Sequence, residues 1–316
     1  MPAKLTSLSY LGLAVEATLG TPVAPTGFIP VKSFKPQDTP QYVADQGYRG
    51  QPVKVFGEYL GTMSSTYEID GDAYPSSFGS ILGAIFGGET VTGTTQPYTH
   101  TFKVAATPGS LTLSDYYVAG FRQWAGAKCD KLTVKFTPDA GLTYTAHFIG
   151  FGSVTGTAPV SQTFGTSPFF LGWEAALNID GTANVKLDSF SVDIARAGSK
   201  ALFSAANSQT PWDIFVGEMT ADWDLSFYME DDSEYTYALA EGKHIVSVTL
   251  TQPSTNYTCN FTSSAVQWTK PTIDRGKEFV AVSISGSAVN NATDSGVITA
   301  ALTNDTSTAQ TTTAAS

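Results

Sequence analysis

Few residues of this chain have the types and spacing that catalysis requires. Its three histidines, His100, His147 and His244, lie far apart in the sequence. No HExxH zinc motif, Gly-x-Ser-x-Gly nucleophile motif or phosphate-binding loop is present. The glycine-rich residues 83–88 follow a predicted helix rather than a strand, so we expect them to end that helix and not to bind a nucleotide. The sequence therefore predicts no enzyme activity, no catalytic residue and no cofactor.

An acidic cluster at residues 230–234 comes nearest to a metal site. Calcium loops hold their carboxylates at spaced positions around a glycine, and this cluster has neither feature. The cluster precedes a predicted helix, where carboxylates favour the positive end of the helix dipole. The two cysteines, Cys129 and Cys259, lack the spacing of metal ligands, so both are expected to be buried free thiols. No metal site is predicted.

The two longest predicted loops hold better candidates for a functional site. Residues 36–52 and 195–211 are expected to be long loops, and loops of such length in compact domains commonly have a function. Exposed aromatic side chains on loops mark interfaces, although each loop could instead fold back over its own aromatic residues. The candidate inter-subunit interface residues are Tyr42, Tyr48, Arg49, Phe56, Phe203 and Trp212.

Composition indicates a mainly β protein of two domains. The length of 316 residues suits two domains of ordinary size, and only 14% of the residues are charged. Seventeen basic and 28 acidic residues give a net charge of −11, which argues against binding nucleic acid by neutralising phosphates. Ordinary solubility and repulsion of a passing polyanion both remain as explanations of that charge.

The N-terminal residues 5–15 resemble a signal peptide only faintly. Polar residues interrupt them, and residues 10–13 return inside the chain as residues 170–173, so we expect a strand rather than a removable signal. No stretch is long and apolar enough to cross a bilayer, and no membrane insertion is predicted.

Several short motifs occur twice in the same order, which predicts two copies of one domain. Gly57-Glu58 returns as Gly217-Glu218, a shift of 160 (217 − 57). Two further pairs repeat at other shifts: Ser33-Phe34 returns as Ser189-Phe190, and Gln123-Trp124 returns as Gln267-Trp268. Two copies at so long a period indicate whole domains rather than solenoid repeats, the alternative being chance agreement between β-rich segments.

The predicted domains are residues 1–160 and residues 161–287, each a β-sandwich or split barrel with one short helix. The helices are expected at residues 74–86 and 232–240. From residue 288 to residue 316 the chain is rich in Ser, Thr and Ala, and we expect a flexible tail because such a segment buries little surface. Strands are expected at residues 5–16, 28–34, 53–69, 98–104, 110–118, 127–136 and 142–151, then at 169–177, 185–194, 212–228, 244–252, 257–261, 265–268 and 278–285.

The opening of the chain resembles the major tail tube proteins of long-tailed (siphovirus-type) bacteriophages. The resemblance rests on residues 12–25 (GLAVEATLGTPVAP), residues 28–31 (FIPV) and the Gly47-Tyr48-Arg49-Gly50 loop, and it covers about the first ninety residues best. It implies a structural virion protein, made in the host cytoplasm, whose tail-tube domains form stacked rings around a hollow lumen. Two domains per chain imply trimeric pseudo-hexameric rings, with hexameric rings as the alternative.

The resemblance also implies the partners of the protein. These are further copies of itself, other tail proteins at the tube ends, and genomic DNA that passes through transiently and without specificity. An acidic lumen would repel DNA phosphates, so we expect the inner surface to be net negative. The alternative function is a secreted or surface β-sandwich adhesin in which the same loops bind a ligand, and an enzyme on a β-scaffold ranks last.

Overall fold

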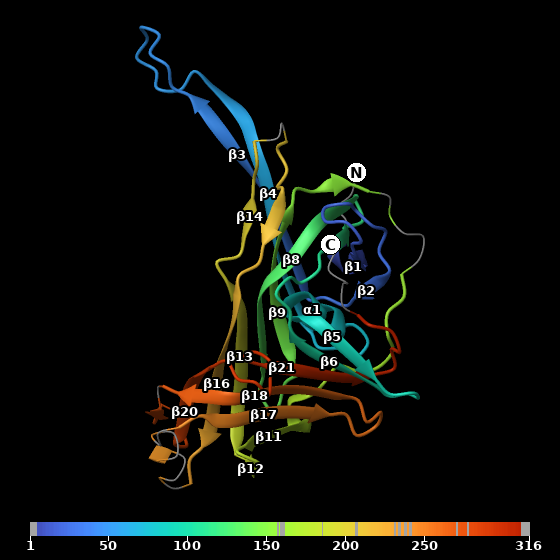
Figure 1. The fold of residues 1–316 in the computed structure, drawn as a ribbon, viewed down its shortest axis with the longest axis vertical. Helices are drawn as coiled ribbons and strands as arrows, with labels where there is room; N and C mark the ends of the chain where they lie inside the picture. The colour runs from blue at the N-terminus through green and yellow to red at the C-terminus, as the bar shows by residue number, and fades with distance from the viewer. Residues whose placement is uncertain are drawn as a thin grey trace.

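Antiparallel β-sheets and the α-helix α1 make up most of the described part of the fold (Figure 1), which confirms the mainly β fold class. The computed structural model describes residues 5–156, 158, 162–184, 186–205, 208–230, 232, 235–236, 239, 242–269, 271–276 and 278–310. The first half contains η1 (Thr6–Leu8), β1 (Tyr10–Val15), β2 (Gly27–Ile29), β3 (Ser33–Asp45), β4 (Gly57–Asp72), α1 (Phe78–Phe86), β5 (Gly87–Thr92), β6 (Tyr98–Val104), β7 (Leu111–Tyr116), β8 (Phe121–Phe136), β9 (Thr143–Phe151) and β10 (Val154–Thr155).

The second half is also built of strands. It contains η2 (Gly172–Glu174), β11 (Ala175–Ile179), β12 (Thr182–Asn184), β13 (Leu187–Ala197), β14 (Lys200–Leu202), β15 (Asp213–Phe215), β16 (Glu218–Tyr228), β17 (His244–Thr251), β18 (Thr258–Trp268), β19 (Thr272–Asp274), β20 (Ala281–Ala288) and β21 (Thr299–Asn304). The helix predicted at residues 232–240 lies mostly outside the described residues.

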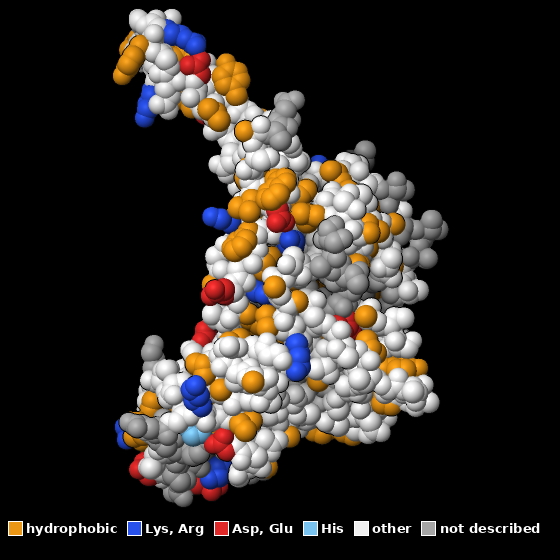
Figure 2. All heavy atoms as spheres, viewed as in Figure 1, with side chains coloured by type: hydrophobic (Ala, Val, Ile, Leu, Met, Phe, Trp, Pro, Cys, Tyr) orange, Lys and Arg blue, Asp and Glu red, His pale blue; other side chains and the backbone are white. Residues whose placement is uncertain are grey.

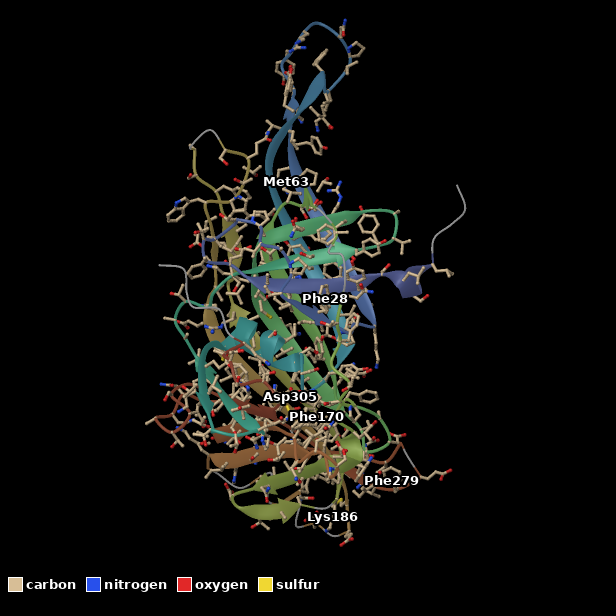
Figure 3. All side chains as sticks on the ribbon, turned by 90° about the vertical axis from the view of Figure 1, so that its right-hand side faces the viewer. Phe28, Met63, Phe170, Lys186, Phe279 and Asp305 are labelled. Carbon is tan, nitrogen blue, oxygen red and sulfur yellow. The ribbon has the colours of Figure 1, made fainter. Side chains whose placement is uncertain are left out.

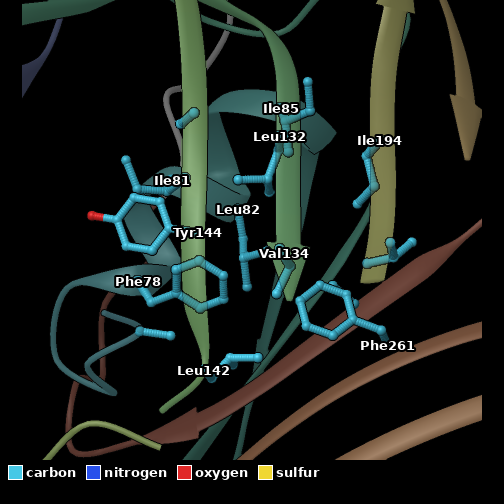
Figure 4. Packing of buried hydrophobic residues seen from close by; sticks show 14 of the residues in the cluster. Phe78, Ile81, Leu82, Ile85, Leu132, Val134, Leu142, Tyr144, Ile194 and Phe261 are labelled. Atoms are coloured by element: carbon cyan, nitrogen blue, oxygen red, sulfur yellow. The ribbon is translucent and has the colours of Figure 1, made fainter. Parts of the chain in front are cut away.

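Helix α1 confirms the first predicted helix, with a later start. Phe78, Ile81, Leu82 and Ile85 recur at helical spacing and are all buried. The helix ends at Gly87, whose φ of 81° is left-handed and whose N–H bonds the Gly83 carbonyl. Figure 4 shows these side chains packed against residues of β8, β9, β13 and β18, so the helix lies in a core shared by both halves.

One long antiparallel sheet runs through both halves of the chain. Its strand order is β3–β4–β9–β8–β13–β16–β20, with β18 and β19 both pairing on the far side of β20. Alternate residues of each strand are buried, as in β9, because one face covers the core and the other face is exposed. This sheet is the scaffold that positions the surfaces described below.

A second layer packs across the core from the long sheet. In the first half β1 pairs with β7, and β7 pairs with the N-terminal part of β8. In the second half β11 pairs with β17, and β17 pairs with β18. Strands β8 and β18 pass from one layer into the other, which gives each half the form of a sandwich.

The predicted loop at residues 36–52 is mostly strand, so this prediction is wrong. Strand β3 continues to Asp45 and pairs with β4 as far as Asp45↔Gly57. The outer part of this hairpin, residues 41–62, is here called the arm, and it projects well beyond the body (Figure 1). Pro36 and Pro40 made the segment look like a loop, but proline is tolerated in an edge strand, and β3 pairs only with β4 in the part of the chain that is described.

The second predicted loop, residues 195–211, is also partly strand. Strand β13 continues to Ala197, and β14 then pairs with β15 in a smaller hairpin. This hairpin lies beside the base of the arm (Figure 1), where the Met63 N–H donates to the Gln209 carbonyl at 2.8 Å. The two segments that were expected to be separate loops therefore support one another.

The predicted flexible tail is wrong for residues 288–304. Strand β21 pairs with β18 through Cys259↔Leu302 and with β6 through Leu302↔His100. Ile298, Ala300 and Leu302 are fully buried at alternate positions. Burial of these apolar side chains, together with strand pairing on both sides, offsets the ordering entropy. Residues 311–316 of the predicted tail lie outside the described residues.

Buried polar groups hold the end of β21 against the first half. His100 Nδ1 lies 2.6 Å from Glu89 Oε1, and His100 Nε2 lies 2.8 Å from the Thr306 carbonyl and 3.0 Å from Asn304 Oδ1. That Asn304 oxygen is an acceptor, because the amide nitrogen donates to the Pro75 carbonyl and the Thr306 N–H donates to Oδ1. Both ring nitrogens thus face acceptors, and only the protonated imidazolium satisfies both.

We predict that this attachment of β21 weakens as the pH rises. Burial opposes the charged form, but the hydrogen bonds to Glu89, Thr306 and Asn304 raise the pKa of His100 above its usual 6.5. Because the folded-state pKa is raised, protonated His100 stabilises the fold fully at pH values below its unfolded-state pKa. This stabilisation is lost as the pH rises through the folded-state pKa. Hydrogen exchange of the Ala300–Leu302 amides, corrected for intrinsic rates, should be slower at pH 6 than at pH 8.5. His100→Gln should remove that difference, whereas His147→Gln should keep it; an unchanged difference in His100→Gln would contradict the prediction.

Candidate assembly surfaces

The arm exposes large apolar side chains far from the core. Tyr48, near its tip, is fully exposed, at 106% of the reference area. Further exposed side chains on the arm are Tyr42, Val43, Val53, Val55, Tyr59 and Leu60. Figure 2 shows hydrophobic side chains on the projecting arm, where the body of the same chain does not cover them. Exposed apolar clusters of this kind mark protein–protein contact sites.

The tip of the arm is held by contacts within residues 45–56. The Asp45 carboxylate pairs with Arg49 and accepts the Gly47 N–H at 3.1 Å. The Arg49 guanidinium lies 4.8 Å from the centre of the Phe56 ring, and the Phe56 N–H donates to the Asp45 carbonyl. Arg49 and Phe56 therefore shape the tip, while Tyr48 beside them extends into solvent.

The small hairpin adds aromatic side chains near the base of the arm. Phe203 and Trp212 are 40% and 69% exposed, and Phe215 is 47% exposed. Gln209 joins this hairpin to the arm through its Nε2, which donates to the Leu60 carbonyl at 3.1 Å. The structure thus places Phe203 and Trp212 near the base of the arm and Tyr42, Tyr48, Arg49 and Phe56 along it.

Sequence reasoning missed several exposed apolar residues of these two hairpins. Tyr59, Leu60 and Phe215 lie in segments predicted as strands, where large apolar residues were assumed to face the core. Alternation alone does not identify the exposed ones, because β4 extends past the core into the arm. The signal that was present in the sequence is the cluster of aromatic residues in and around the predicted loop at residues 36–52.

The exposed face of the long sheet is a second candidate surface, here called the polar face. Carboxylates on this face accept hydrogen bonds from hydroxyl groups on the neighbouring strand. Thr145 donates to Asp70 at 2.8 Å, and Ser287 donates to Asp222 at 2.6 Å. Ser285 donates to Asp224 in the same way. Paired carboxylates and hydroxyl groups therefore recur on neighbouring strands across this face.

Negative charge predominates on the strands of the polar face. The acidic residues are Glu68, Asp70, Asp72, Asp130, Asp193, Glu218, Asp222, Asp224 and Asp274, and the basic residues are Lys35, Lys131 and Lys135. Burial would raise the pKa of Asp70, but hydrogen bonds from Thr145 and Ser33, together with Lys35, hold that pKa below its usual value. This carboxylate therefore stays charged at neutral pH.

The described part of the chain offers little for a metal, thiol or membrane site. Within it, no three His, Cys, Asp or Glu side chains are grouped to hold a metal ion. Cys129 and Cys259 are both buried free thiols, as predicted. The helix described is too short to cross a membrane. The arm and the polar face remain as the two surfaces whose composition needs a functional explanation.

Comparison with known proteins gives the family. Residues 6–288 match the family described as phage tail tube protein. A search of curated proteins gave no significant match. The family match covers both halves of the sandwich, the arm and the polar face, and it favours the tail tube over the adhesin alternative. The chain belongs to the phage tail tube family, whose members are structural proteins of the virion tail and not enzymes.

Proposed function

We propose that this protein is the tube subunit of a siphovirus-type tail, in which stacked rings of three chains enclose a lumen for DNA. The observation that carries the proposal is the long sheet, which crosses both halves and whose outer strands, β3 and β19, each pair on one side only among the described residues. Unpaired edges accept further strands, and a repeated edge-to-edge contact closes into a ring if the rotation allows. Ring closure would turn the sheet into a wall around a channel.

Strand pairing supports the proposal that residues 1–160 and 161–287 are two copies of one domain. Gly57-Glu58 and Gly217-Glu218 stand where β4 and β16 begin, each the second strand of a hairpin. The first strands contain Phe34, which pairs with Ile69, and Phe190, which pairs with Leu225. The sequence separation is 156 residues both between the two phenylalanines (190 − 34) and between their partners (225 − 69). The hairpins therefore correspond at 156 rather than at the 160 suggested by Gly-Glu.

The neighbouring strands extend this correspondence. Ile69 also pairs with Ala146 of β9, and Leu225 also pairs with Ile284 of β20. The layers β1–β7–β8 and β11–β17–β18 have the same order of pairing. The two Gln-Trp motifs do not correspond, because Trp124 pairs with β7 and Trp268 with β20. Residues 288–310 add β21 to the second copy instead of forming a tail.

In this proposal the polar face lines the lumen and the arm connects successive rings. Negative charge facing DNA would keep the wall from binding it, so that DNA slides without a sequence preference. The exposed aromatic residues of the arm and the small hairpin would contact neighbouring chains, including Tyr42, Tyr48, Phe203 and Trp212. Synthesis in the host cytoplasm and contact with other tail proteins at the tube ends follow from the same role.

Electron microscopy and mass measurement of the purified protein test the proposal. We expect hollow tubes at high protein concentration, and rings whose mass equals three chains. Rings of six chains would overturn the trimer and leave the tube in place. A protein that stays monomeric at every concentration would overturn both.

Charge reversal on the polar face is predicted to make tubes bind DNA. Asp222→Lys should let assembled tubes retain short duplex DNA at low salt, with retention falling steeply as salt increases. Asp305→Lys is the matched control, because Asp305 is exposed on a loop after β21 and carries the same charge change. Cosedimentation of labelled DNA with tubes measures the effect. Equal retention by the two variants would show that the polar face does not line the lumen.

A further inference from the structure

We propose that neighbouring chains are joined by a pair of strands, here called a seam, that repeats the antiparallel β8–β13 pair inside each chain. In this seam β19 of one chain pairs antiparallel with β3 of the next. Asp274 then lies opposite Lys35 of the neighbour, and Ile273 lies opposite Pro36. The inference rests on the proposed ring and adds the strands and the register that close it. Its basis is the internal duplication, which makes one seam visible within a single chain.

The seam inside the chain is regular over six residue pairs, from Lys131↔Ala195 to Phe136↔Phe190. On the core side, the Phe136 and Phe190 rings stack with their centres 5.0 Å apart. On the polar side, Thr133 donates to Asp193, and Lys131 Nζ lies 3.7 Å from the same carboxylate. The seam thus joins apolar contacts on one face with polar contacts on the other.

The outer strands of the long sheet supply the two edges that a second seam needs. Strand β3 corresponds to β13, since Phe34 corresponds to Phe190. In the part of the chain that is described, β3 pairs with β4 alone, and β19 pairs with β20 alone. A second copy of this chain is the partner that fits, because it carries the complementary edge, just as β8 and β13 are complementary within one chain.

Strand registers determine which residue of β19 corresponds to which residue of β8. Ala146 and Ile284 correspond, so Tyr144 and Val282, two residues earlier, also correspond. Tyr144 pairs with Val134 of β8, and Val282 pairs with Ile273 of β19. Ile273 therefore takes the place of Val134.

By the same register, Asp274 takes the place of Lys135. Inside the chain Lys135 pairs with Ser191 and Val134 pairs with Val192. At the shift of 156, Ser191 corresponds to Lys35 and Val192 corresponds to Pro36. The equivalent contacts between chains are Asp274 with Lys35 and Ile273 with Pro36.

The side chains at the two edges complement one another in this register. Asp274 and Lys35 have opposite charge and would meet on the polar face, where directly opposed charges stabilise an antiparallel pair. Ile273, already packed against the core, would meet the apolar Pro36. Arg275 would lie opposite Phe34, where a guanidinium can stack on the ring in place of the Phe136–Phe190 contact. A slip of one residue would move Ile273 to the polar face, so the register is strongly specified.

Cysteine cross-linking tests the register directly. Thr272 corresponds to Thr133, and Gln37 corresponds to Asp193, so Thr272 and Gln37 of neighbouring chains should be opposite one another. Both side chains are exposed in the single chain. Opposed residues in an antiparallel pair lie within disulfide reach. Oxidation of Thr272→Cys/Gln37→Cys tubes should give covalent species that stop at three chains on a non-reducing gel.

The matched control is Thr272→Cys/Ser33→Cys, in which the second cysteine lies on the same face four residues away. That separation is about 13 Å along the strand and prevents a disulfide in the proposed register. Tubes of both variants are first checked by microscopy under reducing conditions. If tubes form but Thr272→Cys/Gln37→Cys does not cross-link, the proposed seam is wrong, whether or not the control cross-links. The proposed tube function stands in that case. If the unsubstituted protein forms no rings, the proposed function itself fails.

Discussion

Replacing residues 46–56 with an Asn-Gly turn is expected to suppress tube growth without unfolding the chain. The change removes Tyr48, Val53 and Val55, which are exposed on the arm. Strands β3 and β4 stay paired up to Asp45↔Gly57, and Asn-Gly suits a two-residue hairpin. Buried aromatic anchors dominate interface energies, so losing this set should raise the concentration needed for assembly about tenfold or more. Sedimentation and electron microscopy measure tube yield, and circular dichroism measures folding.

A point substitution separates the tip residue from the shape of the arm. Tyr48→Ser should lower tube yield, since Tyr48 is fully exposed and the Asp45–Arg49 pair that shapes the tip does not involve its side chain. Tyr117→Ser is the matched control, because Tyr117 is a partly exposed tyrosine on the body. Tubes of normal length and yield from the shortened hairpin would rule out an assembly role for the arm.

Arg196→Met is expected to cause the largest loss of stability from a single substitution. The buried Arg196 guanidinium donates through Nε and Nη2 to the Ile85 carbonyl, through Nη2 to the Phe86 carbonyl and through Nη1 to the Ala105 carbonyl. These groups include the last carbonyls of α1, which have no partner within the helix. Methionine fills the space but removes these donors: the Phe86 carbonyl keeps the Ala105 N–H at 2.7 Å, whereas the Ile85 carbonyl loses both of its bonds from Arg196. The expected cost is about 3–5 kcal/mol in the free energy of unfolding. Denaturant titration measures the change.

Two further variants check this interpretation of Arg196. Lys200→Met removes a positive charge from the exposed side of β14 and should change the free energy of unfolding by about 0.5 kcal/mol or less. Arg196→Lys keeps the charge but cannot reach all three carbonyls, so its effect should be intermediate. A stability for Arg196→Met that equals that of Lys200→Met would show that the helix end does not depend on this side chain.

The contact made by Arg196 illustrates what remained hidden in the sequence. The sequence placed Arg196 in a long loop, where an arginine would be solvated. In the structure it lies on β13, in the second half, and bonds a helix of the first half. Sequence patterns report which residues alternate along one element, and they carry no direct signal about which distant element lies opposite. The junction between the halves was therefore decided by tertiary packing.

The sequence by itself determined the mainly β class, helix α1, the buried free cysteines and the family. These features depend on local alternation, on helical spacing that ends at a glycine, and on motifs that are contiguous in the chain. Most strand positions follow from the same alternation, because one face of each strand covers the core.

Only the tertiary structure decided the arm and the position of β21. Proline and small residues in residues 36–45 and 299–304 look like loop or tail when their partners are unknown. Pairing with β4 makes the first segment a strand, and insertion between β6 and β18 makes the second one a strand. Strand formation depends on hydrogen bonds to a partner that is distant in sequence, and a local pattern therefore cannot predict it where the segment itself is short of strand-forming residues.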